Sequence, residues 1–498
     1  MSELHPMEPF TRTLAGVARF LGVEGEFPEI QCTGVTQDSR EIAPGDLFIA
    51  LPGAKGHGAQ YIDQIMAAGA RAVLTDAAGQ ALVAEKLPTI VVSRPDLIAG
   101  DVASWLYNSP FSSLGAVGIT GTNGKTTTAT LLNQLWQAAG RMSGFIGTIG
   151  ISIGDDEFPA EFTTPQATSL HRIAATMRER HVKNLVMEVS SHAIAQKRIA
   201  GAKFNYVAFT NLTQDHLDYH GSMENYFAAK AALFTPEYAN VALINIDDPY
   251  GSALCEMTSI EVQTVSRSNR SAHWHYDRIE ELPLGKGYEV AIRGVGGILI
   301  EGKLPLVGEH NLDNALLAVA LAASTEVDPM VIAAELENLR APAGRLEPVQ
   351  VGQKFIALVD FAHTPDAVER ALATARTLTT GKVIAVLGCG GDRDPGKRLP
   401  MGDALVAGSD VAVFTSDNPR SEEPDEIIRQ MLGSHTVGEN LIVDADRRGA
   451  IAIAVAEAAP GDCVIVLGKG HERGQEIAGV KHPFDDRKEL ARAIEALS

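Results

Sequence analysis

The sequence has few cysteines, few aromatic residues and no long apolar run. Its four cysteines stand far apart in a chain of 498 residues and lack the close spacing of zinc ligands: Cys32, Cys255, Cys389 and Cys463. Scattered cysteines of this kind are typical of buried free thiols in a reducing compartment. No apolar stretch approaches the ~20 residues that span a bilayer, and the start of the chain lacks the pattern of a signal peptide. We therefore expect a cytoplasmic protein without disulfide bonds or membrane insertion.

Basic residues are also scarce. Lys and Arg number 42 against 62 Asp and Glu, which gives a formal net charge of -20. A chain of this charge repels phosphate backbones unless it carries a strong basic patch, and no run of Lys and Arg is present. We therefore expect small-molecule partners and no nucleic acid.

The length and the pattern of apolar runs indicate an α/β protein of about three domains. Short apolar runs of strand length alternate with helical patterns such as 126–140 and 223–234, which predicts parallel sheets. Turn-rich segments at 106–113 and 339–349 mark the expected boundaries. The predicted domains are a small mixed module at 1–110, a central domain at 111–341 and a last domain at 342–498.

Polar loops follow four predicted strands of the last domain, namely "DFAHTPD", "GCGGDRDPGKR", "SDNPR" and "GKGHE". Because the carboxyl ends of parallel strands share one edge of a sheet, these loops are expected to meet there and to form a ligand site. Ordinary polar loops without a role are the alternative.

The segment "GITGTNGKTTT" is typical of a phosphate-binding loop. Gly121, Gly124, Lys125 and Thr126 come directly after the apolar run 114–120 and before a helical pattern. Glycines allow backbone amides to approach phosphates, the Lys supplies charge, and the Thr hydroxyl is a ligand for Mg²⁺. The spacing departs from the usual pattern because Ile119 stands where the first Gly is expected, so a chance Gly-rich turn is the alternative.

Two acidic motifs follow neighbouring apolar runs. "MEVSSH" contains Glu188, and "NLTQDHLDYHG" contains Asp215, His216, Asp218 and His220. Carboxylate and imidazole groups near a triphosphate suit Mg²⁺, although an Asp after a strand is as often a helix cap.

Taken in order, these motifs closely resemble those of the Mur ligases of bacterial peptidoglycan synthesis. The resemblance rests on "GTNGKTT", "MEVSSH", "NLTQDHLDYHG", "YFAAKAALF", "DFAHTPDA", "GCGGDRD", "DNPR" and "GKGHE", and it covers essentially the whole chain. "TQDSREIAPGDLF" is similar to the UDP-sugar module at the amino terminus of the family. The resemblance implies a UDP-sugar-binding domain, a central P-loop ATP-binding domain and a C-terminal Rossmann-like amino-acid-binding domain.

The resemblance also implies a reaction. ATP phosphorylates the γ-carboxylate of D-Glu in UDP-MurNAc-L-Ala-D-Glu, and an amine then displaces phosphate to form an amide. The match is nearest to the members that add meso-diaminopimelate. A carboxylate is a poor electrophile, so phosphorylation supplies the leaving group while Mg²⁺ and Lys125 offset the negative charge.

The family pattern assigns residues to each ligand by position. The triphosphate is assigned to Gly121, Thr122, Asn123, Gly124, Lys125, Thr126 and Thr127, with Asn311 and Asn314 near the adenine and Arg345, Asp360 and His363 closing over ATP. The metal is assigned to Thr126, Glu188, His216 and a carbamoylated Lys230, and Lys125, Lys230, His216 and Glu188 are the catalytic set. An unmodified surface lysine is the alternative for Lys230.

The remaining assignments concern the two substrates that are joined. The nucleotide-sugar dipeptide is assigned to Ser39, Thr163, Thr164, Ser190, Gln196 and Arg198, whereas Phe162 is left out because some members carry Asn there. Diaminopimelate is assigned to Arg393, Asp417, Asn418, Pro419, Arg420, Gly468 and Glu472. A guanidinium suits the distal carboxylate that lysine lacks, so Arg420 is expected to select diaminopimelate. A solvated Arg420 that neutralises Glu422 and Glu423 is the alternative.

Three other functions compete with this one. A lysine-adding Mur ligase and a folylpolyglutamate synthase share the phosphate loop, but "DNPR" argues against both. A nucleotide-binding regulator without ligase activity leaves the four loops of the last domain unexplained. The chain is expected to act as a monomer with ATP and Mg²⁺.

Overall fold

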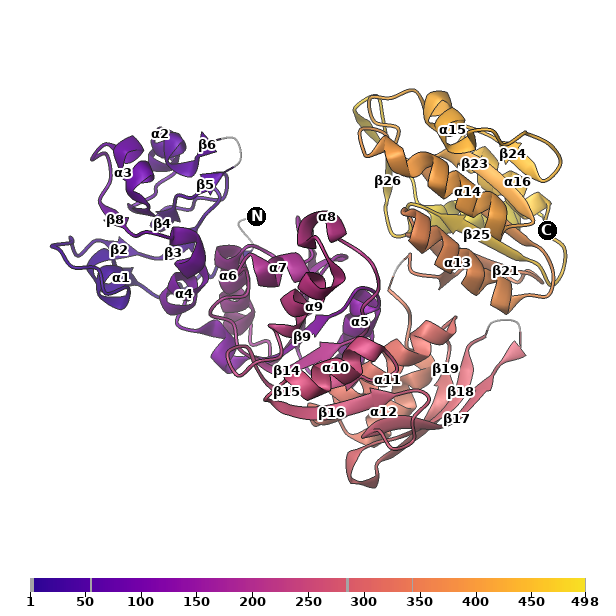
Figure 1. The fold of residues 1–498 in the computed structure, drawn as a ribbon, viewed down its shortest axis with the longest axis horizontal. Helices are drawn as coiled ribbons and strands as arrows, with labels where there is room; N and C mark the ends of the chain where they lie inside the picture. Colours follow the sequence, from indigo (N-terminus) through magenta and orange to yellow (C-terminus); the bar gives the residue numbers. More distant parts are fainter. Residues whose placement is uncertain (1–3, 54–55, 284–285, 343, 498) are drawn as a thin grey trace. The chain divides into compact units, whose positions relative to one another are not determined.

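The computed structural model describes residues 4–53, 56–283, 286–342 and 344–497. It confirms an α/β protein built on parallel sheets (Figure 1). The chain forms two compact units, Met1–Tyr276 with Arg293–Leu299 and Asp313–Ile332, and Asp277–Ile292 with Ile300–Leu312 and Ala333–Ser498. Each of the three predicted domain ranges contains one of the larger sheets, and the exact boundaries stay a prediction.

The N-terminal sheet has four parallel strands in the order β3-β4-β7-β8. Leu47 and Ile49 of β4 pack into one core and Phe48 into another, because successive side chains of a strand point to opposite faces. The elements are β1 (Arg12–Thr13), α1 (Leu14–Phe20), β2 (Gln31–Cys32), β3 (Gly34–Thr36), β4 (Asp46–Ile49), β5 (Pro52–Gly53), β6 (Gly56–His57), α2 (Ile62–Ala67), β7 (Ala72–Thr75), α3 (Ala77–Val83), β8 (Thr89–Val91) and α4 (Pro95–Leu106).

The second sheet has the order β12-β11-β10-β13-β9-β14-β15-β16-β17-β18-β19. Its strands are β9 (Gly115–Thr120), β10 (Ser143–Gly147), β11 (Gly150–Ile153), β12 (Asp156–Phe158), β13 (Asn184–Glu188), β14 (Phe204–Phe209), β15 (Ala239–Asn245), β16 (Glu261–Ser266), β17 (Trp274–Glu281), β18 (Tyr288–Arg293) and β19 (Leu299–Leu304). The helices are α5 (Lys125–Ala138), α6 (Ala167–Glu179), α7 (Ser191–Ala195), α8 (Leu217–His220), α9 (Met223–Ala231), α10 (Pro249–Met257), α11 (Glu309–Ser324) and α12 (Pro329–Glu335).

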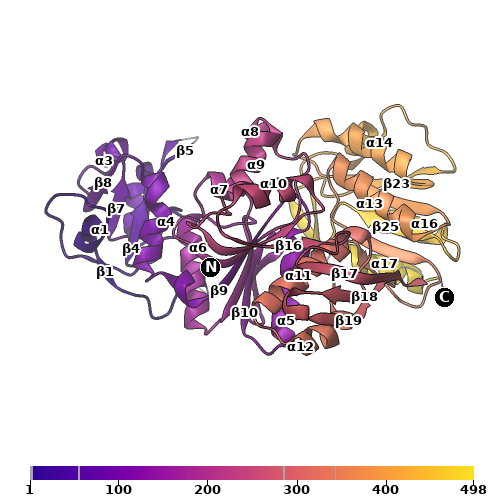
Figure 2. The same cartoon turned by 60° about the horizontal axis from the view of Figure 1, so that its bottom comes forward.

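Strand β9 lies between β13 and β14 in this sheet, and all three run parallel. Figure 2 labels β9 and β10 of this sheet, and α5, the helix that follows β9. Their carboxyl ends therefore lie side by side, and they carry the phosphate loop, Glu188 and the segment that leads to His216. The order of the strands brings three motifs to one edge although about 100 residues separate the first from the last.

The C-terminal sheet has the order β20-β21-β25-β22-β23-β24, in which the five strands from β21 to β24 are parallel. Helices α13, α14 and α15 cover one face, and α16 and α17 cover the other. The elements are β20 (Glu347–Pro348), β21 (Ile356–Asp360), α13 (Pro365–Leu378), β22 (Val383–Cys389), α14 (Arg398–Gly408), β23 (Val411–Ser416), α15 (Pro424–Leu432), β24 (Leu441–Val443), α16 (Arg447–Ala456), β25 (Cys463–Leu467), β26 (Gly474–Ile477), β27 (Val480–Pro483) and α17 (Asp486–Glu495).

Two predictions from composition can be compared with the structure. All four cysteines are free, and only Cys255 is partly exposed. Within the described ranges, none of the helices combines the length and the apolar character needed to cross a bilayer.

Candidate active site

The phosphate loop joins β9 to α5, and its glycines are required by close contacts. Gly121 has φ +148° and a Cβ there would lie 1.9 Å from Thr210 Oγ1. Gly124 has φ +85°, and a Cβ would lie 2.1 Å from Asn314 Oδ1. Both positions therefore exclude larger residues, and the loop leads into the amino terminus of α5, the end of a helix that favours an anion.

The segment after β14 holds the loop in shape. Asn211 accepts hydrogen bonds from the amides of Thr122 and Asn123, at 2.9 and 3.0 Å. Thr210 Oγ1 donates to the carbonyl oxygen of Asn123 at 2.6 Å. Asn211 is the first residue of "NLTQDHLDYHG" and Thr210 directly precedes it, so the start of that motif shapes the phosphate loop.

Two lysine side chains converge on the carbonyl oxygen of Gly121. Lys125 Nζ donates to it at 2.9 Å, and Lys230 Nζ donates to it at 2.8 Å. Lys230 is 2% exposed, so the alternative of a surface lysine is wrong. Burial, and then the charge of Lys125, lower the pKa of Lys230 well below its usual value. Two amines so close together favour an anion as their neighbour.

Thr126 and Glu188 meet in the interior beside this loop. Thr126 Oγ1 donates to Glu188 Oε2 at 3.0 Å, and both residues are buried. Glu188 Oε1 also accepts from the amide of Thr148 at 2.8 Å, and Thr148 Oγ1 donates to Glu188 Oε2 at 3.3 Å. Thr148 was missed from the sequence because no motif marks the turn after β10.

His216 lies among aromatic rings. Its side chain is half exposed, with Nε2 3.3 Å from Asp215 Oδ2, and its ring centroid is 4.8 Å from that of His192. The described residues include no group of three His, Cys, Asp or Glu side chains arranged to hold a metal ion. The structure thus joins Thr126 to Glu188 directly, whereas no direct contact joins His216 to either of them among the described hydrogen bonds and ion pairs.

Four of the six residues predicted to hold the nucleotide-sugar dipeptide form one hydrogen-bonded cluster, and Thr163 joins it through Thr148 and Glu188, whose carbonyl oxygen accepts from Thr164 Oγ1 at 2.9 Å. Thr164 accepts from the amide of Ser190 at 3.1 Å, and Arg198 donates to the carbonyl oxygen of Thr164 at 3.2 Å. Arg198 also donates to Gln196 Oε1 at 2.6 Å. Thr163 Oγ1 lies 3.1 Å from Thr148 Oγ1, which links the cluster to Glu188.

Phe162, which was left out of the prediction, supports the same cluster. The guanidinium of Arg198 lies over its ring at 4.8 Å from the centroid. Ser39 is on a turn after β3, and its neighbour Gln37 donates to Gln166 at 3.3 Å. This bond joins the segments that hold Ser39 and Thr164.

The residues predicted for the amino acid gather at the carboxyl ends of β22, β23 and β25. Asn418 Nδ2 donates to Glu472 Oε2 at 2.8 Å. A Cβ on Gly468 would lie 2.8 Å from Asp417 Oδ2, and one on Gly390 would lie 3.1 Å from Arg420 Nη1. Three of the four predicted loops therefore meet at one edge of the sheet.

Lys469, Glu472 and Asp417 influence one another's charge in these loops. Lys469 is fully buried, and its Nζ donates to Asn418 Oδ1 at 3.0 Å and to Glu472 Oε2 at 2.8 Å. Burial acts to raise the pKa of Glu472, but the charge and hydrogen bond of Lys469 outweigh it, and the pKa is lowered. Burial raises the pKa of Asp417, and Lys469 opposes that shift.

The acidic partner of Arg420 differs from the alternative suggested by the sequence. Glu422 pairs with Arg398 at 2.8 Å, whereas Arg420 Nε lies 3.5 Å from Glu476 Oε2 and its Nη1 donates to the carbonyl oxygen of Gly391 at 2.6 Å. Arg420 also has φ +53°, a conformation that is uncommon for a residue with a side chain. The alternative, a solvated Arg420 that neutralises Glu422, is therefore wrong.

Comparison with known proteins places the chain in a family. Models of that family match residues 31–104 (Mur ligase family, catalytic domain), 119–322 (Mur ligase middle domain) and 344–470 (Mur ligase, glutamate ligase domain). The UDP-N-acetylmuramoyl-L-alanyl-D-glutamate–2,6-diaminopimelate ligase of Streptomyces coelicolor is 45% identical over 98% of this chain and 97% of its own. The chain belongs to the Mur ligase family.

Further comparisons concern two enzymes of the same name and a folylpolyglutamate synthase. The enzyme of the same name from Xylella fastidiosa is 38% identical over 94% of this chain and 95% of its own. A solved structure with that name has a TM-score of 0.70 and 30% identity, and covers 100% of this chain and 98% of its own. A folylpolyglutamate synthase from Mycobacterium tuberculosis, at 22% identity, 75% and 92% coverage and a TM-score of 0.59, shares the fold.

In this Mur ligase, the residues predicted to close over ATP lie around Phe361. The Arg345 guanidinium lies 5.2 Å from the ring centroid of Phe361, and the ring of His363 lies 4.6 Å from it. Asp360 accepts hydrogen bonds from the amides of Leu346 and Ala362, at 2.7 and 2.8 Å. Asp360 therefore shapes this turn, and Asn311 lies apart on α11 with its Nδ2 donating to Val307 at 2.7 Å.

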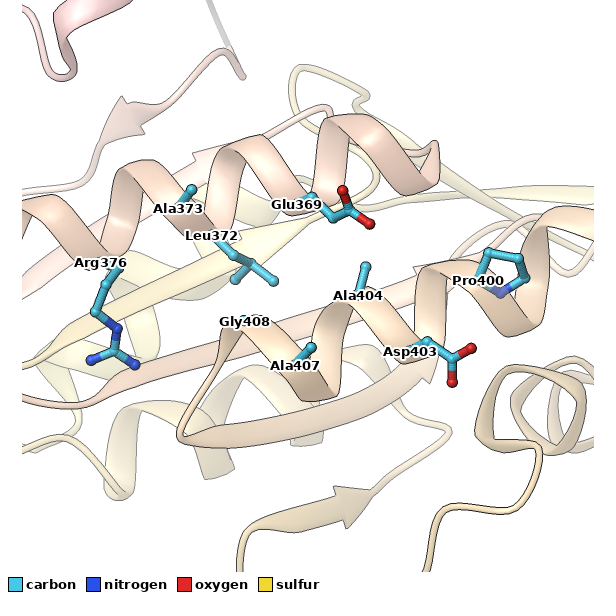
Figure 3. A pocket seen from close by; sticks show the side chains of 9 residues that line it. All are labelled: Glu369, Leu372, Ala373, Arg376, Pro400, Asp403, Ala404, Ala407 and Gly408. Atoms are coloured by element: carbon cyan, nitrogen blue, oxygen red, sulfur yellow. The ribbon is translucent and has the colours of Figure 1, made fainter.

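A cavity of about 600 Å³ lies between α13 and α14, on the face of the C-terminal sheet that α13, α14 and α15 cover (Figure 3). Glu369 and Arg376 of α13 and Asp403 of α14 line it together with small apolar residues. It contains none of the residues predicted for ATP, the metal or the substrates, so we assign it no part in the chemistry of this Mur ligase.

Proposed function

We propose that this Mur ligase adds meso-diaminopimelate to UDP-MurNAc-L-Ala-D-Glu in an ATP-dependent reaction of peptidoglycan precursor synthesis. The names of its relatives support this substrate pair. The observation that carries the choice of amino acid is the cluster of Arg420, Asn418 and Glu472 on loops of one sheet edge. A carboxylate beside Arg420 and an ammonium beside Glu472 match the two charges at one end of diaminopimelate.

The phosphate loop is the proposed site of ATP and Mg²⁺. The oxygen donors Thr126 and Glu188, 3.0 Å apart, fit Mg²⁺, which needs only one or two protein ligands beside phosphates and water. His216 is proposed as a further ligand from its place in the motif. When bound, the metal neutralises charge on the phosphates. Lys125 and the amides of the loop hold the triphosphate, and in this way the protein aligns it with the γ-carboxylate of D-Glu.

The dipeptide cluster and the amino-acid loops supply the other two reactants. Arg198, Thr164 and Ser190 are proposed to hold the nucleotide-sugar dipeptide so that its D-Glu carboxylate reaches the γ-phosphate. Phosphorylation turns that carboxylate into an acyl phosphate, and the amine of diaminopimelate displaces phosphate with loss of a proton. Arg345, Asp360 and His363 are also proposed to bind ATP.

Lys230 is proposed to be carbamoylated. Its amine is buried beside Gly121 and Lys125, where an added carboxylate removes the repulsion between two amines. A neutral lysine amine attacks CO₂ and releases one proton as the carbamate forms, and the lowered pKa of Lys230 favours the neutral form. Intact-mass measurement in bicarbonate buffer is expected to show one added CO₂ in wild-type enzyme and none in Lys230→Ala. A bare amine in the active, bicarbonate-supplied enzyme would exclude the modification.

Two alternatives remain within the same fold, a lysine-adding Mur ligase and a folylpolyglutamate synthase. Lysine has no distal carboxylate, so a lysine-adding enzyme has no use for the cation that Arg420 offers. The regulator without ligase activity gives no reason for the convergence of three loops around Asn418 and Glu472. We further propose that the enzyme works in the cytoplasm as a monomer, because one chain contains the groups for all three substrates.

Kinetics of Arg420→Ala test the proposal. The KM for diaminopimelate is expected to rise about ten- to a hundred-and-fifty-fold, because a charged hydrogen-bonded contact contributes roughly 1.5–3 kcal/mol. The KM for ATP is expected to stay within about twofold. Arg429→Ala is the matched control, because this arginine has 71% side-chain exposure and pairs only with Glu426 among the described acids. Equal KM values for diaminopimelate in wild type and Arg420→Ala would contradict the proposal.

A further inference from the structure

Arg447 and Asp486 form a buried ion pair outside every motif described above. The side chains of both residues are 0% exposed, and each residue is the first of its helix, α16 and α17. Arg447 Nε donates to Asp486 Oδ1 at 2.7 Å, and Nη2 donates to Asp486 Oδ2 at 2.6 Å. The pair is therefore bidentate and fully enclosed.

The remaining donors of Arg447 reach the backbone. Nη1 donates to the carbonyl oxygen of Ser416 at 3.2 Å, and Nη2 donates to that of Leu467 at 2.8 Å. Ser416 is the last residue of β23, and Leu467 is the last residue of β25. One guanidinium thus contacts the carboxyl ends of two strands.

These two strands are not neighbours, because β22 lies between them. Adjacent strands are ~4.8 Å apart, so the backbones of β23 and β25 are roughly 10 Å apart and exchange no ladder hydrogen bonds. Arg447 therefore ties directly two strand ends that the sheet joins only through β22. The residues that follow are Asp417–Arg420 on one side and Gly468–Glu472 on the other.

A buried ion pair is not needed for packing at this place. Well-packed apolar side chains usually stabilise a core as well as an enclosed pair does. The two backbone contacts give a reason for this pair, because they fix the separation of two loops that must act together. The bond from Asn418 to Glu472 at 2.8 Å spans these loops and depends on that separation.

We infer that Arg447, oriented by Asp486, is a positioning residue of the amino-acid site. It holds the loops after β23 and β25 at the spacing at which Arg420 and Asn418 on one loop and Glu472 on the other engage the same amino acid. Arg447 touches no substrate, and the inference rests on the proposed function of these loops. A displacement of one loop by about 1 Å is enough to lower the efficiency of an aligned site strongly.

Steady-state kinetics of Arg447→Lys and Asp486→Asn test the inference. Lysine keeps the charge, but one ammonium on a flexible stem does not replace a planar fork that serves Asp486 and two carbonyl groups. The KM for diaminopimelate is expected to rise at least tenfold in both variants, and the KM for ATP is expected to stay within twofold. The preference for diaminopimelate over lysine is expected to fall as well.

Arg448→Lys is the matched control. Arg448 is the next residue of α16, its side chain is 61% exposed, and it pairs with Glu489 at 2.8 Å. This variant is expected to keep the wild-type KM for diaminopimelate. A thermal melt of each variant separates loss of folding from loss of positioning. If Arg447→Lys does not fold, Asp486→Asn supplies the test, because it keeps the arginine but removes the charged carboxylate that orients its guanidinium toward the two carbonyl groups.

The inference is overturned if a folded Arg447→Lys or Asp486→Asn variant keeps the wild-type KM for diaminopimelate, even when its melting temperature falls. That result would assign the pair to stability alone. The wild-type enzyme in the same assay tests the proposed function separately: failure to use diaminopimelate at all would reject the proposed function, whereas normal use by both wild type and variants would reject only the role of Arg447.

Discussion

The side chain of His171 shows how burial controls a single residue. It is fully buried on α6, its Nε2 lies 2.8 Å from the carbonyl oxygen of Ala200, and its Nδ1 has no hydrogen-bond partner among the described residues. Burial lowers the pKa of His171 to about 4. The neutral imidazole is therefore part of the folded core, and protonation opposes folding.

The sign of the resulting pH dependence follows from the two pKa values. In the unfolded chain a histidine has a pKa of ~6.5. Between pH ~6.5 and pH about 4, His171 is therefore protonated in the unfolded state and neutral in the folded state. The stability that His171 contributes is complete above pH ~6.5 and is lost as the pH falls towards 4.

We expect wild-type enzyme to lose about 2 kcal/mol more stability than His171→Gln between pH 7.5 and pH 5, because only the wild type has this buried titrating group. Urea unfolding at the two pH values measures the difference. Equal losses in both proteins would contradict the lowered pKa.

At the scale of an element, helix α5 offers two glycines with opposite surroundings. Gly124 caps its start with φ +85°, and Gly140 follows its end with φ +70°. A Cβ on Gly124 would lie 2.1 Å from Asn314 Oδ1, whereas a Cβ on Gly140 would meet nothing within 4 Å. The left-handed backbone is common to both, so a comparison isolates the close contact in the phosphate loop.

We expect both Gly124→Ala and Gly140→Ala to destabilise the fold by roughly 1–2 kcal/mol, because alanine is strained at positive φ. Only Gly124→Ala is expected to weaken ATP binding, by at least about tenfold, since the loop must move away from Asn314. Titration with ATP and a thermal melt measure the two effects. Unchanged ATP affinity in Gly124→Ala would show that the loop does not form the nucleotide site.

The sequence was sufficient to predict β9, α5 and the parallel strands, because local apolar runs and glycines specify them. The predicted apolar run 114–120 agrees with β9 to within one residue, and the helical pattern 126–140 agrees with α5 to within two residues at each end. The strands between 274 and 304 were not predicted, although each pairs with the preceding strand of the chain, because they mix apolar with charged residues and form no continuous apolar run.

The site was predictable to the extent that it lies in motifs. Thr148 was missed because its contact with Glu188 requires β10 to pair with β13, which no local pattern reveals. Lys469 was missed for a similar reason, since it lies inside "GKGHE" but acts by joining Asn418 to Glu472 across two loops. Glu422 pairs with Arg398, which lies 24 residues earlier in the chain, so this pair was missed as well.

At the scale of the whole molecule, the phosphate loop and the residues proposed for the nucleotide-sugar dipeptide belong to the first unit, and the amino-acid loops belong to the second. An amide bond requires all three reactants, so neither the phosphate loop nor the amino-acid loops alone accounts for the reaction. The central claim therefore concerns the complete chain and its choice of amino acid.

Product formation by the full-length enzyme tests that claim most directly. ATP, Mg²⁺ and UDP-MurNAc-L-Ala-D-Glu are supplied with either meso-diaminopimelate or lysine, and ADP and the UDP-linked tripeptide are measured together. We expect one ADP for each tripeptide with diaminopimelate and a kcat/KM for lysine lower by at least about a hundredfold, because Arg420 would be left without its carboxylate. Equal use of lysine, or ATP hydrolysis without a tripeptide, would contradict the account.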